Sequence, residues 1–433
     1  MSYLFGEVDS YYADTAVNGE RYPSLNGHVD VDVCVVGAGF SGLNTAIELA
    51  ERGLTVVIVE AKTVGWAASG RNGGQLIRGF GADLSRFERI LGVEGVAALY
   101  KLGLETVEIV QNRILKYQID CDLTWGFCEL AKTHAQFRGL AEEKAALERA
   151  GYQEHLELVP PSEMAKVTSS QCYVGGLIDP GSGHLHPLNL AKGEAAAAKR
   201  LGVRIFEHTA ALDITYGSTV TVKTADGSVT AHTLVLAGNA HLGSLEPRIS
   251  AKVLPAGSFI IATERLSQSE ANSIVPFNRA LCDQGVALNY FRLSADRRLL
   301  FGGSGPFTGT DPKDIEGFMR PKMLRVFPDL AAKRIDYKWG GMIGVGANRL
   351  PQIGRLRGHR NVYYAQAYSG HGLNMSHMAG RLIAEAITQQ DDGRGFDLFA
   401  AVPHMSFPVV KYFRSPLLAV GMLWHRLKER LTE

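Results

Sequence analysis

Residues 31–60 read VDVCVVGAGFSGLNTAIELAERGLTVVIVE, and their pattern decides the fold. Residues 31–36 are apolar and mostly β-branched, which is typical of a buried parallel strand. The G-x-G-x-x-G sequence of 37–42 follows, and apolar residues then recur at helical spacing until Gly53. Residues 55–59 are again apolar and β-branched. The stretch therefore predicts a β-α-β unit.

The glycines and the acid of this unit predict a dinucleotide site. Gly37 permits the tight turn, Gly39 lets backbone N–H groups approach a pyrophosphate, and Gly42 lets helix and strand pack closely. Glu60 ends the second strand, where a carboxylate accepts hydrogen bonds from a ribose diol and repels a 2′-phosphate. This pattern suits NAD as well as FAD. The alternative is a glycine-rich β-α-β unit without a ligand.

The composition narrows the class of protein. The chain has 433 residues, 46% of them hydrophobic, which allows two domains of a soluble globular protein. The formal net charge of +1 gives no reason to expect nucleic acid as a partner. No run of about twenty apolar residues predicts a transmembrane helix. Five scattered cysteines without a C-x-x-C favour a reducing cytoplasm. His184 and His186 lack partners at metal-ligand spacing, so we expect no metal site.

Alternating patterns predict an α/β (α+β) fold. We expect residues 1–30 to form an extended arm and residues 175–190 a turn-rich entry into a helix. The other predicted helices are 84–118, 134–150, 191–201, 315–327 and 370–387. The other predicted strands are 124–131, 203–206, 219–223, 233–237, 253–264, 287–293, 298–302, 337–343 and 362–366.

This order of elements predicts a discontinuous Rossmann-like cofactor domain and an inserted, mostly antiparallel substrate domain. The segments expected in the cofactor domain are 31–115, 175–250 and 340–433. The segments expected in the substrate domain are 116–174 and 251–339. Residues 416–431 form an amphipathic basic pattern. We favour packing of that helix on its own domain or on a second subunit, and contact with a membrane surface is the alternative.

Two more glycine-rich stretches can line a cofactor site. Residues 68–75 read ASGRNGGQ, in which Arg71 can neutralise a pyrophosphate while Asn72 and Gln75 form hydrogen bonds at a ring edge. Residues 368–375 read YSGHGLNM and open the last long helix, whose N-terminal dipole suits a group that becomes anionic. The alternatives are an ordinary surface loop for the first stretch and simple helix capping for the second.

Five motifs together resemble the FAD-dependent D-amino-acid-oxidase superfamily, and within it the gamma-glutamylputrescine oxidoreductases and gamma-glutamylpolyamine oxidases. They are VDVCVVGAGFSGL, GWAASGRNGGQL, SGHLHPLNL, RLPQIGR and YSGHGLNMSHMAGRL, spread over nearly the whole chain. The resemblance implies FAD between two domains and oxidation of a substrate C–N bond. It also implies an aldehyde, ammonia or an amine, and H2O2 as products, in polyamine catabolism. The expected partners are a small-molecule amine and O2.

The resemblance also assigns residues. Sarcosine-oxidase relatives attach their flavin through a Cys in a late glycine-rich turn, where this chain has Ser304, so we expect non-covalent FAD. The residues expected to bind FAD are Gly37, Gly39, Phe40, Ser41, Gly42, Glu60, Ala61, Lys62, Ala68, Ser69, Gly70, Arg71, Asn72, Gly73, Gly74, Gln75, Leu76, Ala211, Leu212, Ala237, Gly238, Tyr368, Ser369, Gly370, His371, Gly372 and Leu373.

The residues expected to be catalytic are Lys252, Tyr368 and His371. Lys252 stands in a K-x-x-P setting that resembles the oxygen-activating lysine of monomeric sarcosine oxidases, and the alternative is a surface lysine. Arg78 or Arg292 is expected to pair with a substrate carboxylate, unless each forms a structural salt bridge. Aromatic walls for an alkylamine are expected from Trp66, Tyr290, Trp339 and Tyr368, unless these are core aromatics.

Two other functions stay open. One is an oxidase or dehydrogenase of another secondary amine or amino acid. The other is a non-catalytic flavin-binding protein.

Overall fold

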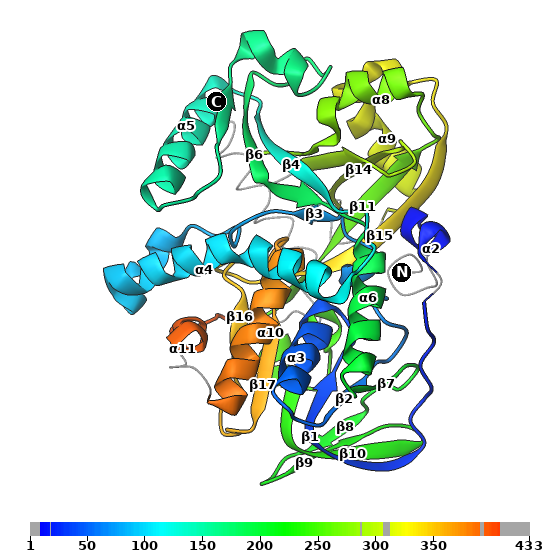
Figure 1. The fold of residues 1–433 in the computed structure, drawn as a ribbon, viewed down its shortest axis with the longest axis vertical. Helices are drawn as coiled ribbons and strands as arrows, with labels where there is room; N and C mark the ends of the chain where they lie inside the picture. Colours follow the sequence, from blue (N-terminus) through cyan, green and yellow to red (C-terminus); the bar gives the residue numbers. More distant parts are fainter. Residues whose placement is uncertain (1–8, 18, 286–287, 306–311, 390–393, 408–433) are drawn as a thin grey trace.

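The computed structural model describes residues 9–17, 19–285, 288–305, 312–389 and 394–407. It contains two β-sheets at opposite ends of the molecule, and the long helix α4 crosses between them (Figure 1). The α-helices are α2 (Tyr11–Thr15), α3 (Phe40–Glu51), α4 (Glu88–Tyr117), α5 (His134–Arg149), α6 (Pro187–Arg200), α7 (Pro247–Ser250), α8 (Gln268–Ile274), α9 (Ile315–Val326), α10 (Gly372–Thr388) and α11 (Arg394–Ala401).

The first sheet has the strand order β16-β17-β10-β1-β2-β7, with β9 paired to β10 and β8 to β9. Its strands are β1 (Gly27–Val36), β2 (Val56–Val59), β7 (Arg204–Phe206), β8 (Asp213–Thr215), β9 (Val220–Lys223), β10 (Gly227–Leu236), β16 (Gln352–Arg355) and β17 (Val362–Gln366). Strand β1 runs parallel to both of its neighbours, β2 and β10.

Both faces of β1 are buried, which explains its continuous apolar run. Val33 and Val35 belong to the core that holds the apolar residues of α3, α6 and α10. Cys34 and Val36 belong to the core on the opposite face, with Val222 of β9. Since successive side chains of a strand point to opposite faces, one short segment supplies both cores. This arrangement fixes β1 and the turn after it at the centre of the sheet.

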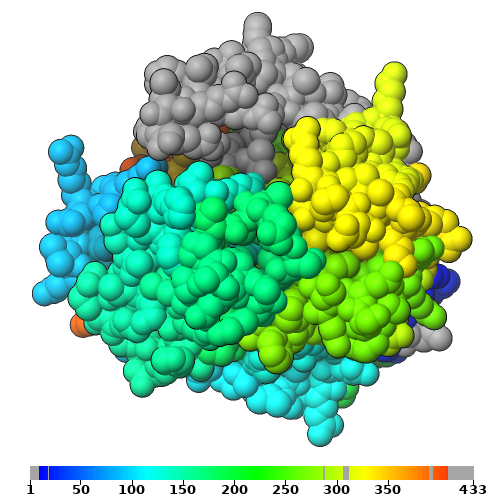
Figure 2. Space-filling model, turned by 90° about the horizontal axis from the view of Figure 1, so that it is seen from above, coloured from blue at the N-terminus to red at the C-terminus, as the bar shows by residue number. Residues whose placement is uncertain are grey.

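The second sheet has the order β15-β11-β14-β13-β12-β4-β6-β3, with β5 beside β6. Its strands are β3 (Gln75–Leu76), β4 (Thr124–Ala131), β5 (Glu157–Val159), β6 (Gly175–His184), β11 (Leu254–Thr263), β12 (Ala280–Asp283), β13 (Asn289–Leu293), β14 (Leu299–Ser304) and β15 (Ile335–Val345). Its pairings are antiparallel except between β12 and β4. Seen from above, the cyan-to-green part of the chain, which contains β4 and β6, lies next to the yellow-green and yellow parts that follow residue 250 (Figure 2).

The chain passes from the first sheet to the second at the glycine-rich stretch 68–75. Strand β3 follows this stretch directly and pairs with the end of β6. The loop after β2 is therefore tied to the second sheet. Any site between the two sheets has this loop in its wall.

The structure confirms the α/β fold class with its mixed parallel sheet and its curled, mostly antiparallel sheet. The prediction for residues 175–190 is wrong in part, because Gly175–His184 forms strand β6 between β4 and β3. Its Pro180 falls where the pairing with β4 shifts register, opposite Gly126, so no ladder hydrogen bond is lost there.

Three smaller differences concern element bounds. The expected arm contains helix α2, and β1 begins at Gly27 rather than at residue 31. The short strands β3, β5, β8, β12 and β16 and the short helices α7, α8 and α11 are missed. The division into domains stays a prediction. Strand β6 lies in the segment 175–250, which is expected in the cofactor domain, but it pairs within the second sheet. The amphipathic segment 416–431 lies outside the described residues.

Candidate active site

A cavity of about 1640 Å³ lies between the two sheets. Its walls come from the residues that follow β1 and β2, from the glycine-rich stretches 68–75 and 368–372, and from strands β11, β13 and β15 of the second sheet. These segments are far apart in the chain. The fold brings the three glycine-rich stretches together around one space.

The turn after β1 has the backbone that the G-x-G-x-x-G pattern requires. Gly37 has a φ of +108°, which favours glycine. A Cβ on Gly42 would lie 1.9 Å from the Gly37 carbonyl oxygen, so only glycine lets α3 approach the turn. A Cβ on Gly39 would lie 2.8 Å from the Ser69 hydroxyl oxygen, which itself accepts a hydrogen bond from the Phe40 amide at 2.9 Å. The first two glycine-rich stretches therefore touch.

Glu60 lies at the end of β2 with its carboxylate held by backbone amides. Its two oxygens accept hydrogen bonds from the Ala38 and Lys62 N–H groups, each at 2.8 Å. Burial raises the pKa of Glu60, and these hydrogen bonds oppose the shift. A carboxylate has about four lone-pair sites, so acceptor capacity remains for a ribose diol. The residues present thus fit the nucleotide end of a dinucleotide cofactor.

The polar side chains of 68–75 mostly shape their own loop. The Asn72 amide donates to the Ala68 and Ser69 carbonyl oxygens, both at 2.9 Å, and its oxygen accepts from the Gly74 amide. The Gln75 amide donates to the Leu281 carbonyl oxygen at 2.9 Å. Both side chains line the cavity, and the amide N–H groups of both donate to carbonyl oxygens of the protein.

Arg71 and Trp66 form one unit in the cavity wall. The Arg71 guanidinium carbon lies 4.3 Å from the centroid of the Trp66 ring, and its Nε donates to the Trp66 carbonyl oxygen at 2.6 Å. Burial lowers the pKa of Arg71 to about 10, so it stays cationic at neutral pH. A cation is thus available close to the dinucleotide turn.

The stretch 368–372 is joined to α3 and to β15. The Tyr368 and Ser41 hydroxyl oxygens lie 2.6 Å apart, and burial raises the pKa of Tyr368. The Gly346 amide donates to the Ser369 hydroxyl at 3.2 Å. Helix α10 begins at Gly372, so its N-terminus opens on the cavity.

His371 also lines the cavity, and its Nδ1 is buried without a hydrogen-bond partner among the described residues. Burial and the nearby Arg349 lower the pKa of His371 to about 4, which keeps the imidazole neutral at neutral pH.

Most of the predicted residues come together. Those that line the cavity are Gly37, Gly39, Phe40, Ser41, Glu60, Ala61, Lys62, Trp66, Ala68, Ser69, Arg71, Asn72, Gly73, Gln75, Ala211, Ala237, Gly238, Tyr290, Tyr368, Ser369, Gly370, His371, Gly372 and Leu373. Those that do not line it are Gly42, Gly70, Gly74, Leu76, Arg78, Leu212, Lys252, Arg292 and Trp339.

The glycines that do not line the cavity are needed for packing. A Cβ on Gly70 would lie 2.4 Å from the Gly65 carbonyl oxygen, and one on Gly74 would lie 2.2 Å from that of Leu185. Leu76 is fully buried in the core. Leu212 is 62% exposed and points away from the site.

The two arginines expected to grip a carboxylate are paired elsewhere. Arg78 is buried and forms ion pairs with Asp179 at 2.7 Å and Glu143 at 3.1 Å. Arg292 is buried and donates to the carbonyl oxygens of Gly73 at 2.7 Å and Leu185 at 2.9 Å. The first is a structural salt bridge, and the second joins β13 to the glycine-rich loop.

Two other expected residues also lie outside the cavity. Trp339 is 1% exposed, and its Nε1 donates to the Arg71 carbonyl oxygen at 3.0 Å, so it is a core aromatic. Lys252 is partly buried, which lowers its pKa, and the cavity wall begins two residues later at Leu254. Its role toward O2 stays a prediction.

Several lining residues are missing from the sequence prediction. They include Asn239, His241, Cys282, Arg349 and residues 341–346, which form the end of β15 and the residue after it. Only Arg349 has a sequence signal, since it opens the RLPQIGR motif. Within the described part of the chain, no group of three or more His, Cys, Asp or Glu side chains can hold a metal ion. No described helix is long and apolar enough to cross a membrane.

The fold and the cavity define a class of proteins that bind a dinucleotide at one sheet and carry a second sheet across the cofactor site. Residues 32–386 match the model of the FAD dependent oxidoreductase family, DAO. The chain belongs to this family, and it is an FAD-dependent oxidoreductase. The glycine turn, the acceptor capacity of Glu60 and the open N-terminus of α10 fit FAD.

Known proteins agree with this assignment. The chain is 42% identical over 425 residues to gamma-glutamylputrescine oxidoreductase of Escherichia coli K12, which covers 98% of this chain and 99% of that protein. Glycine oxidase from Geobacillus kaustophilus superposes with a TM-score of 0.72 at 22% identity over 87% of this chain and 100% of that one. L-proline dehydrogenase from P. horikoshii gives 0.73 at 20% identity over 87% and 98%. These two structures bear on the fold alone.

Proposed function

We propose that this protein oxidises a C–N bond of gamma-glutamylputrescine or a related gamma-glutamyl polyamine, with water and O2 consumed and an aldehyde, ammonia or an amine, and H2O2 released. The 42% identity to the E. coli enzyme over almost the full length carries the proposal. The cavity supports it, since about 1640 Å³ exceeds the roughly 300–1,000 Å³ of an ordinary ligand pocket and leaves room for substrate beside a dinucleotide.

In this proposal the residues of the chain bind, orient and exclude water. FAD, when bound, supplies the acceptor for the hydride. Glu60 would accept hydrogen bonds from the ribose of FAD, and the N-terminus of α10 would face the group of the cofactor that becomes anionic. Tyr290 forms an apolar wall for the alkyl chain, because its hydroxyl is held 2.9 Å from the Ser258 hydroxyl and its ring lies against Gly73.

We further propose that FAD is held without a covalent bond. Ser304, which the resemblance matches to the attaching Cys of sarcosine-oxidase relatives, lines the cavity. Cys282 also lines the cavity, but burial raises its pKa, so its weakly nucleophilic thiol form prevails. Acid precipitation should therefore leave FAD in the supernatant. Flavin that stays with the precipitated protein would contradict this.

Anaerobic titration tests the substrate. Gamma-glutamylputrescine should bleach the flavin absorbance of the purified protein, whereas putrescine, sarcosine and D-amino acids should bleach it weakly. A coupled peroxide assay in air should rank these amines in the same order. The substrate proposal fails if no gamma-glutamyl amine bleaches the flavin.

A second candidate is a dehydrogenase of another secondary amine or amino acid. It is favoured by one observation: Lys252, the residue expected to assist O2, does not line the cavity. Slow reoxidation of the bleached protein by air would support a dehydrogenase. Fast reoxidation with formation of peroxide would support an oxidase.

A further inference from the structure

The cavity carries an excess of positive charge. Among the described residues that line it, four side chains are cationic, and the single carboxylate is that of Glu60. The cationic residues are Lys62, Arg71, Arg86 and Arg349. Because the carboxylate of Glu60 lies at the nucleotide end, where its remaining acceptor capacity suits a ribose diol, the wall offers little to a second ammonium group of a diamine. The charges favour a substrate that carries a carboxylate.

Three of the four cations have partners close by. Lys62 and Arg71 both lie over the Trp66 ring, at 5.8 Å and 4.3 Å from its centroid. Arg86 forms an ion pair with Asp83 at 3.2 Å. Within the part of the chain that the structure describes, no hydrogen bond or ion pair to the Arg349 guanidinium is found. Arg349 is therefore the cation best able to receive a ligand.

The backbone of Arg349 is held beside the turn 368–371. Its φ of +63° is uncommon for a residue with a side chain, and its amide donates to the Gly346 carbonyl oxygen at 3.1 Å. Gly346 in turn donates to the Ser369 hydroxyl at 3.2 Å. On the other side the Asn348 side-chain oxygen lies 3.3 Å from His404 Nδ1. A strained residue that is pinned on both sides suits a defined role at a site.

His371 supplies the second polar group at this place. It is close enough for the charge of Arg349 to lower its pKa, and its buried Nδ1 has no partner among the described residues. Gly81, with a φ of +65°, makes room for the ring, because a Cβ there would lie 2.3 Å from Nδ1. A free guanidinium next to a neutral imidazole offers two kinds of N–H donor to one anion.

We propose that Arg349, with His371 beside it, binds the carboxylate at the glutamyl end of the substrate and so selects carboxylate-bearing amines over free diamines. The identity of the substrate rests on the proposed function, whereas the position of the carboxylate site rests on the charges and contacts of this cavity. The gamma-glutamyl group would thus be the part of the substrate that the wall recognises.

Three amides of putrescine test the proposal with the FAD-loaded enzyme. Gamma-glutamylputrescine has the carboxylate and the α-amino group, glutarylputrescine keeps only the carboxylate, and 4-aminobutanoylputrescine keeps only the amino group. Arg349→Ala should raise KM for the first two by about ten- to a hundredfold and leave KM for the third unchanged. Arg349→Lys should be intermediate, because it keeps the charge but loses the bidentate geometry.

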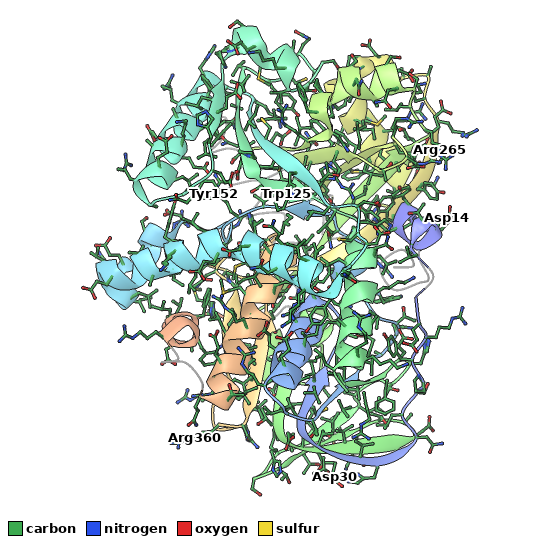
Figure 3. All side chains as sticks on the ribbon, in the orientation of Figure 1. Asp14, Asp30, Trp125, Tyr152, Arg265 and Arg360 are labelled. Carbon is green, nitrogen blue, oxygen red and sulfur yellow. The ribbon has the colours of Figure 1, made fainter. Side chains whose placement is uncertain are left out.

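Two matched arginines serve as controls. Arg86→Ala removes a different cation of the wall, and Arg360→Ala removes an exposed arginine at the end of the molecule formed by the first sheet (Figure 3). Neither should change the ratio of KM between glutarylputrescine and 4-aminobutanoylputrescine. Equal KM changes for all three amides in Arg349→Ala, or the selective effect in Arg86→Ala instead, would overturn the proposal.

A binding measurement separates this proposal from the proposed function. If the wild-type protein oxidises none of the three amides, the proposed substrate is wrong. Glutarate is then titrated against the flavin absorbance of the wild type and of Arg349→Ala. A Kd at least about tenfold weaker in the variant supports the carboxylate site. A wild type that binds glutarate no better than the variant overturns it.

Discussion

Gly42 shows how closely the cofactor turn depends on single atoms. An added Cβ on Gly42 would lie 1.9 Å from the Gly37 carbonyl oxygen, which is far below any real contact distance. Neither atom can rotate away, because the oxygen belongs to the backbone and the Cβ is bonded directly to it. The helix would have to move away from the turn. Since α3 presents its N-terminus at this turn, any such movement also displaces the amides that face the cavity.

We therefore expect Gly42→Ala to lower FAD content at least about tenfold and to destabilise the protein by about 1–3 kcal/mol. Gly139→Ala is the matched control, because a Cβ at this position in helix α5 meets nothing within 4 Å. It should leave FAD content unchanged and stabilise the protein by up to about 1 kcal/mol. Flavin absorbance per protein and urea unfolding measure both effects. Equal FAD content in the two variants would contradict the account.

The arginines show what residue type cannot reveal. From sequence, Arg78 and Arg292 are the predicted partners of a carboxylate, and Arg349 is not singled out. The structure separates them, because Arg78 is buried in ion pairs with Asp179 and Glu143 and Arg292 donates to carbonyl oxygens, whereas Arg349 lines the cavity. The partners of Arg292 come from segments more than a hundred residues away. The local sequence pattern does not indicate such long-range contacts.

Helices α6 and α10 are joined by a buried pair of side chains, Glu194 and His377, which lies next to helix α3. His377 of α10 directs Nε2 to the Glu194 carboxylate of α6 at 2.5 Å and Nδ1 to the Leu373 carbonyl oxygen at 2.7 Å. Both side chains are fully buried, and the His377 ring lies 5.5 Å from the ring of Phe40 at the start of α3. The pair therefore sets the spacing of three helices on one face of the first sheet.

Glu194→Ala should destabilise the protein by about 3–5 kcal/mol, because it leaves His377 buried without its partner. Glu148→Ala is the control, since Glu148 pairs with Lys144 one turn away on the exposed face of α5. That change should stay within about 0.5 kcal/mol. Urea unfolding followed by circular dichroism measures both. If Glu194→Ala costs no more than Glu148→Ala, the pair has no structural importance.

Elements with clear periodicity follow the sequence prediction, whereas the glycine-rich strand β6 does not. Strand β4 and helix α5 agree with their patterns almost to the residue. Strand β6 is missed because GGLIDPGSGH looks like a turn. Its glycines are needed where β4 and neighbouring side chains approach, as at Gly183, where a Cβ would lie 2.3 Å from the Thr124 carbonyl oxygen. That demand exists only once the sheet has formed.

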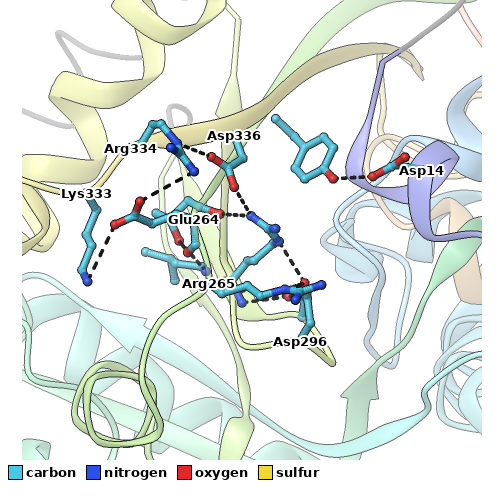
Figure 4. Close-up of polar contacts among 12 residues, drawn as sticks. Asp14, Glu264, Arg265, Asp296, Lys333, Arg334 and Asp336 are labelled. Atoms are coloured by element: carbon cyan, nitrogen blue, oxygen red, sulfur yellow. Dashed lines mark hydrogen bonds and ion pairs between the residues drawn. The ribbon is translucent and has the colours of Figure 1, made fainter.

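At the level of the whole molecule, a network of charges closes the outer end of the second sheet and holds the N-terminal helix (Figure 4). Arg298 pairs with Asp296 at 2.9 Å and with Asp336 at 2.6 Å. The Tyr337 hydroxyl donates to the Asp14 carboxylate, which ties α2 to β15. The network therefore joins the N-terminal helix α2 to strand β15 of the second sheet.

This network predicts how stability depends on pH. Burial alone would raise the pKa of Asp296, but hydrogen bonds, including those from Ser294, Arg265 and Arg298, lower it to about 2. A depressed pKa adds stability above the unfolded value of about 4, and that contribution is lost as pH falls from about 4 to about 2.

Asp296→Asn should therefore lower the free energy of unfolding at pH 6 by about 2 kcal/mol and flatten its fall between pH 4 and pH 2. Asp226→Asn is the control, since Asp226 is exposed in a hairpin turn where Asn is equally suitable. Urea unfolding at several pH values gives the comparison. An acid dependence in Asp296→Asn identical to that of the wild type would contradict the assignment.

The β-α-β unit, the three glycine-rich stretches and the alternation of strands and helices follow from the order of the residues, because periodicity and glycine spacing encode local geometry, which neighbours in the chain largely satisfy. The FAD-dependent class follows instead from the resemblance of five motifs to a known family. Which cations remain unpaired, and that Arg349 rather than Arg78 or Arg292 lines the cavity, depends on the folded molecule. Charges are paired across space by residues distant in the chain, so only the assembled cavity shows which one is left to meet a substrate.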